Sequence, residues 1–140
     1  MAGSENARAI ELRRLNTVEE FREAVRLQQE IWGFDDIELL PVRLFVVAHK
    51  VGGQTIGCYD GREMVGFLLA IPGLKSGEEP YLHSHMMGVK DSYRDKGLGR
   101  RMKLAQREEA LERGIRLVEW TFDPLELKNA HFNIERLGAV

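Results

Sequence analysis

Apolar side chains recur along this chain in two rhythms, one typical of helices and one typical of strands. Helices are predicted after the capping box Thr17-x-x-Glu20, after Pro41, after a glycine-containing loop near residue 97, and over about 125–137. Strands are predicted over residues 8–14, 54–59, 63–71, 81–89 and 115–121, with a hairpin signal at Asp60-Gly61. The resulting order, β-α-α-β-β-β-α-β-α, predicts an α/β fold with helices around one sheet.

Composition is typical of one globular domain and excludes several classes of partner. The 140 residues are 44% hydrophobic and 30% charged, with a net charge of −2, so we expect no nucleic-acid and no membrane partner. Residues 1–7 are predicted to be a disordered lead, and residues 8–140 a single domain. Cys58 is the only cysteine, so no intrachain disulfide can form, and a cytoplasmic location is expected.

The most informative segment lies between the fourth predicted strand and the helix that follows, and contains Gly97 and Gly99. Glycine lets the backbone approach a ligand closely, and the N–H groups of a first helical turn favour an anion such as a pyrophosphate. Basic residues surround that turn although the helix dipole disfavours them there, which indicates an anionic partner. The alternative is a solvated basic helix face after a glycine turn. No Gly-Lys-Ser/Thr follows the glycines, so the segment is not a Walker loop.

The pattern Arg94-x-x-Gly97-x-Gly99, with Tyr93 before it, resembles motif A of the GNAT superfamily of acyl-CoA-dependent N-acyltransferases. The resemblance implies a GNAT-like mixed, mostly antiparallel central sheet flanked by helices. It also implies acetyl-CoA as co-substrate, and no metal. The residues it implies for coenzyme A binding around this motif are Met87, Gly88, Val89, Arg94, Asp95, Lys96, Gly97, Leu98, Gly99, Arg100 and Arg101.

Two histidines, His83 and His85, fall on one face of the strand that leads to the glycine loop, because side chains alternate along a strand. Met87 and Val89 have the same parity, so we expect them on that face too. Imidazoles titrate near neutral pH and can remove a proton from an ammonium substrate, which makes the pair candidate general bases. This stretch resembles the His-x-His strand of the amine-acetylating GNAT members. The alternatives are a solvated strand face, core histidines, or a metal site.

A second group of candidates comes from the last predicted strand and helix. Glu119 is a second candidate base, although a surface ion pair is the simpler interpretation. In the resembling family the coenzyme's pantetheine arm lies between this strand and the histidine strand. Asn129 and Asn133 lie in a segment similar to motif B of that family, which implies contacts with coenzyme A. Ile134 stands where the family often has a tyrosine that protonates the leaving thiolate, and isoleucine cannot do this.

The resemblance also implies two further strands after residue 140, so the domain is expected to be C-terminally truncated. An unpaired sheet edge invites pairing with a second chain, which predicts a homodimer. Two functions remain open from the sequence. One is an N-acetyltransferase that moves an acetyl or other acyl group from acyl-CoA to a small-molecule or peptide primary amine by direct attack in a ternary complex. The other is an acyl-CoA-binding module without catalysis.

Overall fold

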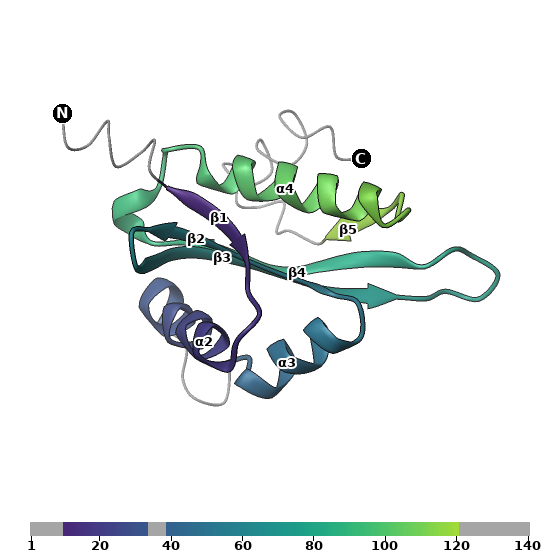
Figure 1. The fold of residues 1–140 in the computed structure, drawn as a ribbon, viewed down its shortest axis with the longest axis horizontal. Helices are drawn as coiled ribbons and strands as arrows, with labels where there is room; N and C mark the ends of the chain where they lie inside the picture. The colour runs from purple at the N-terminus through teal and green to yellow at the C-terminus, as the bar shows by residue number, and fades with distance from the viewer. Residues whose placement is uncertain (1–9, 34–38, 121–140) are drawn as a thin grey trace.

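The computed structural model describes residues 10–33 and 39–120, and Figure 1 shows the arrangement of their elements. The elements are β1 (Glu11–Arg14), α2 (Val18–Trp32), α3 (Val42–Lys50), β2 (Gln54–Asp60), β3 (Glu63–Gly73), β4 (Tyr81–Val89), η1 (Asp91–Tyr93), α4 (Leu98–Glu112) and β5 (Val118–Trp120). The predicted order is confirmed as far as β5. The predicted lead at 1–7 and the predicted helix over 125–137 lie outside the described residues.

The five strands form one sheet in the order β1-β2-β3-β4-β5. Each of the first four strands is antiparallel to its neighbours in that series, and β5 pairs with β4 in parallel. The fold class predicted from the sequence, a mixed and mostly antiparallel sheet flanked by helices, is therefore confirmed. Among the described residues β5 is shorter than predicted, because residues 115–117 are not part of the strand.

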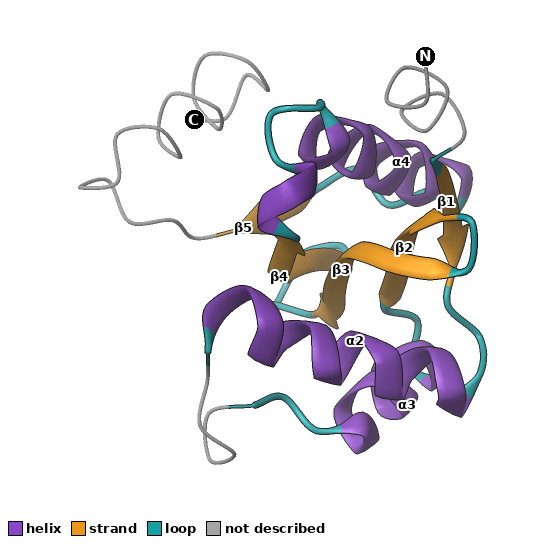
Figure 2. Cartoon of the chain, turned by 90° about the vertical axis from the view of Figure 1, so that its left-hand side faces the viewer, coloured by secondary structure: helices purple, strands orange, loops and turns teal. Residues whose placement is uncertain are grey.

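Helices cover both faces of the sheet: α2 and α3 lie on one face and α4 lies on the other (Figure 2). On the α2/α3 face, a cluster around Phe21, Phe45 and Phe67 fills the space between helices and strands. On the α4 face, Leu68 and Met102 belong to a second cluster. The sheet thus separates two apolar layers, and each face of β4 meets a different environment.

Local sequence signals explain where the first two helices begin and end. The Thr17 side chain accepts a hydrogen bond from the Glu20 amide while the Glu20 side chain accepts one from the Thr17 amide, so the predicted capping box is formed. Gly33 ends α2 in the left-handed conformation, with φ of 65°. Pro41 precedes α3 as predicted.

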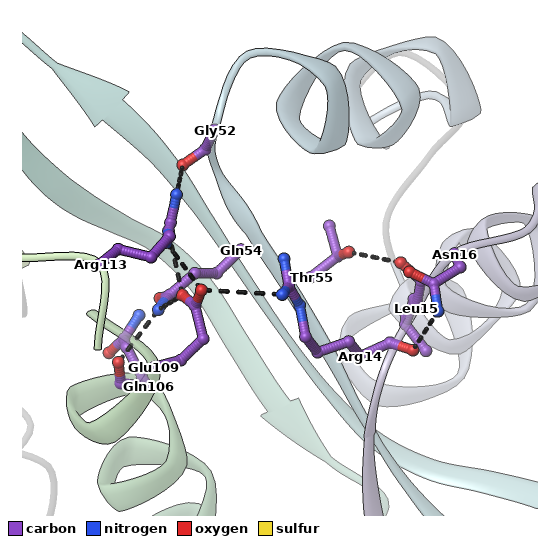
Figure 3. A network of polar contacts seen from close by, with 9 residues as sticks. All are labelled: Arg14, Leu15, Asn16, Gly52, Gln54, Thr55, Gln106, Glu109 and Arg113. Carbon is purple, nitrogen blue, oxygen red and sulfur yellow. Dashed lines mark hydrogen bonds and ion pairs between the residues drawn. The ribbon is translucent and has the colours of Figure 1, made fainter. Parts of the chain in front are cut away.

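The C-terminal half of α4 is tied to β2 and to the loop before it by a polar network (Figure 3). Arg113 forms an ion pair with Glu109 at 2.7 Å and donates a hydrogen bond to the Gly52 carbonyl at 2.8 Å. The Gln54 amide donates to the main-chain carbonyl of Gln106 at 3.0 Å. These contacts fix α4 across the sheet and leave its N-terminal end beside the glycine loop.

Candidate active site

A β-bulge in β4 determines which side chains face which helices. Leu69 of β3 pairs with Met86, whereas its neighbour Ala70 pairs with Ser84, so His85 is the extra residue on β4. His83 pairs with Ile71, which packs against the α2/α3 cluster. His83 therefore lies on the α2/α3 face.

The bulge makes one expectation from the sequence wrong. Met87 and Val89 pack against the cluster on the α4 face, not on the face of the histidines. Strict alternation would have kept all four side chains on one face, but the extra residue at His85 shifts the parity of every later residue in β4. The side chains of Met87 and Val89 consequently lie on the face of the sheet opposite to the histidines.

The histidine pair lies beside Glu119, as the parallel pairing of His83 with Glu119 dictates. The two imidazole rings are 6.2 Å apart between centroids. The Nδ1 atom of His83 is 3.7 Å from a carboxylate oxygen of Glu119, and the other oxygen of Glu119 is 3.3 Å from the Lys75 ammonium. Lys75 reaches this point from the loop of the protruding β3–β4 hairpin (Figure 1). Glu119 thus lies near Nδ1 of His83 and beside Lys75 at the same time.

The surroundings of His85 make its imidazole less basic. Desolvation by its surroundings, together with the nearby His83 imidazole, holds the pKa of His85 below its usual value near 6.5. A histidine with a lowered pKa is neutral at physiological pH and can accept a proton. His85 therefore meets the first chemical requirement of a general base.

The glycine loop joins η1 to α4 through two residues in the left-handed region. Asp95 has φ of 64° and Gly97 has φ of 77°. Gly97 is the N-cap residue of α4 and has no side chain with which to cap the helix, so the amides of the first turn face the loop. No atom of the described residues lies within 4 Å of the position that a Cβ on Gly97 would take. This open space is the kind of cradle in which backbone amides can approach an anion.

The basic residues of this loop have different partners. Arg94 is exposed and pairs with Asp91 at 3.2 Å, and the Lys96 ammonium lies 5.3 Å from the centre of the Tyr93 ring. Arg101 instead donates to the Ile10 carbonyl at 3.0 Å, which ties α4 to the chain before β1. Arg94 and Lys96 are consequently the better placed of these cations to meet an anion at the loop.

In a comparison with known protein families, residues 9–139 of the chain match the family described as "Acetyltransferase (GNAT) family". The chain belongs to the GNAT acetyltransferase family. This match confirms the resemblance seen in the glycine motif. The family uses acetyl-CoA. Comparison with curated proteins finds no significant match.

Solved GNAT structures share the fold of this chain at low sequence identity. An aminoglycoside acetyltransferase from an uncultured soil metagenomic sample, in complex with trehalose, has a TM-score of 0.78 at 16% identity, covering 89% of this chain and 85% of that one. A protein described as a transcriptional regulator from Bacillus halodurans C-125 has a TM-score of 0.75 at 22% identity, covering 94% and 93%. Aminoglycoside N-acetyltransferase AAC(6')-Iy in complex with CoA has a TM-score of 0.72 at 14% identity, covering 94% and 88%.

The GNAT site has one polar cluster that the sequence did not reveal. Lys103 of α4 is buried, with 8% of its surface exposed, and its ammonium donates to the Ser84 hydroxyl at 2.9 Å and to the Gln106 side-chain oxygen at 3.3 Å. It also lies 4.3 Å from the centre of the Trp120 ring. In the sequence, the sign of this cluster is that Lys103 stands one position from the apolar stripe of an amphipathic helix.

The remaining candidates of the GNAT site fall into three groups. Met87, Gly88 and Val89 form the end of β4 next to the loop, as expected. Asn129, Asn133 and Ile134 lie outside the described residues. Cys58 is fully buried and its pKa is raised to about 11 by desolvation, which fits a packing role and not a nucleophile.

Two further properties of the described part of the chain bear on other functions. Within it, no three histidine, cysteine, aspartate or glutamate side chains group as metal ligands would. In the same residues, no helix combines the length and apolar character needed to cross a bilayer.

Proposed function

We propose that this protein is an N-acetyltransferase that transfers the acetyl group of acetyl-CoA to a primary amine. The observation that carries the proposal is that a single strand, β4, connects the two half-sites. Alternation along β4 presents His83 and His85 on one face, and the end of this strand leads into the glycine loop at the start of α4.

Coenzyme A would be held by the glycine loop and the end of β4. The uncapped amides after Gly97 and the side chains of Arg94 and Lys96 suit its pyrophosphate. Main-chain groups of Met87, Gly88 and Val89 suit the amides of its pantetheine arm. Asn129 and Asn133 are proposed as further contacts on the strength of the motif alone. Acetyl-CoA supplies the activated acyl group as a thioester.

The acceptor amine would approach from the α2/α3 face, because both histidines lie there. His85 removes the amine proton, since its lowered pKa keeps it neutral at pH 7. His83 stands 6.2 Å away between ring centroids, with a Glu119 oxygen 3.7 Å from its Nδ1, and is proposed to pass the proton on. Glu119 is engaged by Lys75 as well, which favours an orienting role over that of the base itself.

The acceptor is proposed to be a small-molecule or peptide amine. Solved structures with this fold include aminoglycoside acetyltransferases, one of them in complex with sisomicin, so aminoglycosides belong among the amines to test. Polyamines, arylalkylamines and peptide N-termini complete a panel that covers small and extended primary amines.

Thiol release from acetyl-CoA with this panel tests the proposal. An amine-dependent release that saturates with both substrates, and initial-rate lines that intersect, would support direct attack in a ternary complex. If the protein binds coenzyme A in calorimetry but no amine stimulates thiol release, the second function applies, that of an acyl-CoA-binding module without catalysis. Ile134, in the place of a proton-donating tyrosine, is the observation that favours this alternative.

A further inference from the structure

A buried ammonium that pairs with no carboxylate of the described residues lies behind the histidine pair. Within residues 10–33 and 39–120, the Lys103 ammonium contacts neutral groups: the Ser84 hydroxyl, the Gln106 amide oxygen and the face of the Trp120 ring. Among the described residues, no aspartate or glutamate forms an ion pair with it. Burying a charge without a counter-charge is costly, and here desolvation lowers the pKa of Lys103 to about 8. Such a site is expected to be stabilised by an anionic ligand.

The place of Lys103 relative to β4 suggests which anion it meets. Ser84 stands between His83 and His85 in the sequence, but its side chain lies on the α4 face, since its partner Ala70 belongs to the cluster on that face. Two candidate bases and one cation therefore flank the same point of β4 from opposite faces of the sheet. Acyl transfer can use a base and a cation at separate points, because proton removal occurs at the entering nitrogen and negative charge develops on the leaving group.

We propose that the Lys103 ammonium stabilises the coenzyme A thiolate as it leaves. This inference rests on the proposed function, which places the acyl-CoA along β4. The glycine loop follows the far end of β4, about 17 Å of strand from Ser84. That separation leaves room for an extended pantetheine arm between a pyrophosphate at the loop and a sulfur atom beside Ser84.

The step is balanced without any other reactant. The neutral amine nitrogen forms a bond to the carbonyl carbon, and the carbon–sulfur bond breaks. The electron pair of that bond goes to sulfur, and the nitrogen proton goes to His85. The thiolate is left beside Lys103, which remains protonated. This charge stabilisation removes the need for a proton donor at position 134.

Equilibrium binding of coenzyme A and desulfo-coenzyme A tests the inference without turnover. The two probes differ only at the sulfur, and the thiol of free coenzyme A, like other alkyl thiols, titrates at or above the cysteine value of about 8.5. If Lys103 stabilises the thiolate, the affinity for coenzyme A relative to desulfo-coenzyme A should rise by up to about tenfold per pH unit between pH 6.5 and 8. In Lys103→Met the ratio should be independent of pH, whereas the exposed control Lys50→Met should retain the wild-type slope. Calorimetry measures the six affinities, three proteins with two probes, at each pH.

Each outcome of this experiment decides between defined alternatives. A ratio that does not vary with pH in the wild type, or a slope that persists in Lys103→Met, would overturn the role of Lys103 while leaving the proposed function intact. Absence of binding by either probe would contradict the proposed function and this inference with it. Should Lys103→Met fail to fold, Lys103→Gln takes its place, and a slope that persists in Lys103→Gln would overturn the role of Lys103.

Kinetics provide a second readout. Lys103→Met should lower kcat by about 10²-fold, the usual effect of removing one stabilising donor, with little change in the KM for acetyl-CoA. Thioesters of more acidic thiols should recover most of that loss, because their thiolates need less stabilisation. A loss of the same size for every leaving group would indicate a structural role and overturn the inference.

Discussion

At the scale of single residues, the site depends on a three-residue segment, His83-Ser84-His85, in which alternation directs neighbours to opposite faces of β4. The histidines lie near Glu119, and the serine meets Lys103 on the α4 side. In the proposed mechanism, the chemistry of amine acetylation is divided across this single strand. Substitutions here should separate proton transfer from coenzyme binding.

Replacement of His85 by Gln should lower turnover by about 10²–10⁴-fold, the range expected for a general base, while coenzyme A affinity stays the same. Because the pKa of His85 is lowered, wild-type turnover should fall only as the pH drops below about 6.5. This rising limb of the pH profile should flatten in His85→Gln. In His83→Gln the limb should move to higher pH, since the nearby His83 charge no longer opposes protonation.

His49→Gln is the matched control for this series, because His49 lies on α3, where its ring contacts Phe21. It should keep both the rate and the pH profile of the wild type. Full activity and an unchanged profile in the double variant of His83 and His85 would show that the histidines are structural. Glu119→Gln would then be the next variant to measure.

Gly97 offers a comparison of two glycines with the same backbone conformation. Gly97 and Gly77 have φ of 77° and 76°, and for both, no neighbouring atom of the described residues lies within 4 Å of the point that a Cβ would occupy. Leucine at either position costs about 1–2 kcal/mol of stability through the left-handed backbone. Only Gly97→Leu should weaken coenzyme A binding in calorimetry, because its side chain enters the space proposed for the pyrophosphate. Equal affinities in the two variants would remove the glycine loop from the binding site.

At the scale of elements, local sequence signals account for much of the architecture. Thr17 and Glu20 cap α2 as predicted, and β2 and β3 form the predicted hairpin, although the two residues between them are Gly61 and Arg62. These features are encoded within a few residues of one another, so a single sequence reveals them.

Two features of the site are not encoded locally. The bulge at His85 arises from how β3 pairs with β4, and an alternating His-Ser-His pattern carries no sign of it. The burial of Lys103 depends on the packing of α4 against β4 and β5, and a lysine in an amphipathic helix is ordinarily exposed. The sequence therefore predicts the histidines and the glycine loop, but not the side of the sheet on which each group lies.

Gly88 determines how closely α2 packs against β4. A Cβ at this position would lie 2.6 Å from Cη2 of Trp32 and 3.0 Å from Cδ1 of Ile31. Gly88→Ala should lower the free energy of unfolding by about 1–3 kcal/mol in urea denaturation, because the core must make room. In a Trp32→Ala background the same change should cost less, and an equal cost in both backgrounds would contradict this packing.

At the scale of the whole molecule, the buried Lys103 ammonium makes the stability of the fold vary with pH in the alkaline range. Its pKa is about 8 in the folded protein and about 10.5 when unfolded, so between these values the unfolded state binds more protons. Stability should therefore rise with pH across this window, as the penalty for burying the charge is lost. The free energy of unfolding of Lys103→Met, measured in urea, should exceed that of the wild type at pH 7 by on the order of 3 kcal/mol.

The difference between Lys103→Met and the wild type should shrink toward pH 10, and Lys50→Met should show no such trend. Other groups titrate in this range as well, but they are common to all three proteins and cancel in the comparison. A constant difference between pH 7 and pH 10 would show that Lys103 is not a buried cation in the folded state.

Direct transfer of an acetyl group to an amine is tested most directly by tracing the acetyl carbon. The protein is mixed with acetyl-CoA labelled in the acetyl group and an amine that stimulates thiol release, and the mixture is analysed by mass spectrometry at intervals within one turnover. Direct transfer predicts that the label passes from the thioester to the amine nitrogen without appearing on the protein. Label on a protein side chain before it reaches the amine, or label that stays on coenzyme A with every amine in the panel, would contradict it.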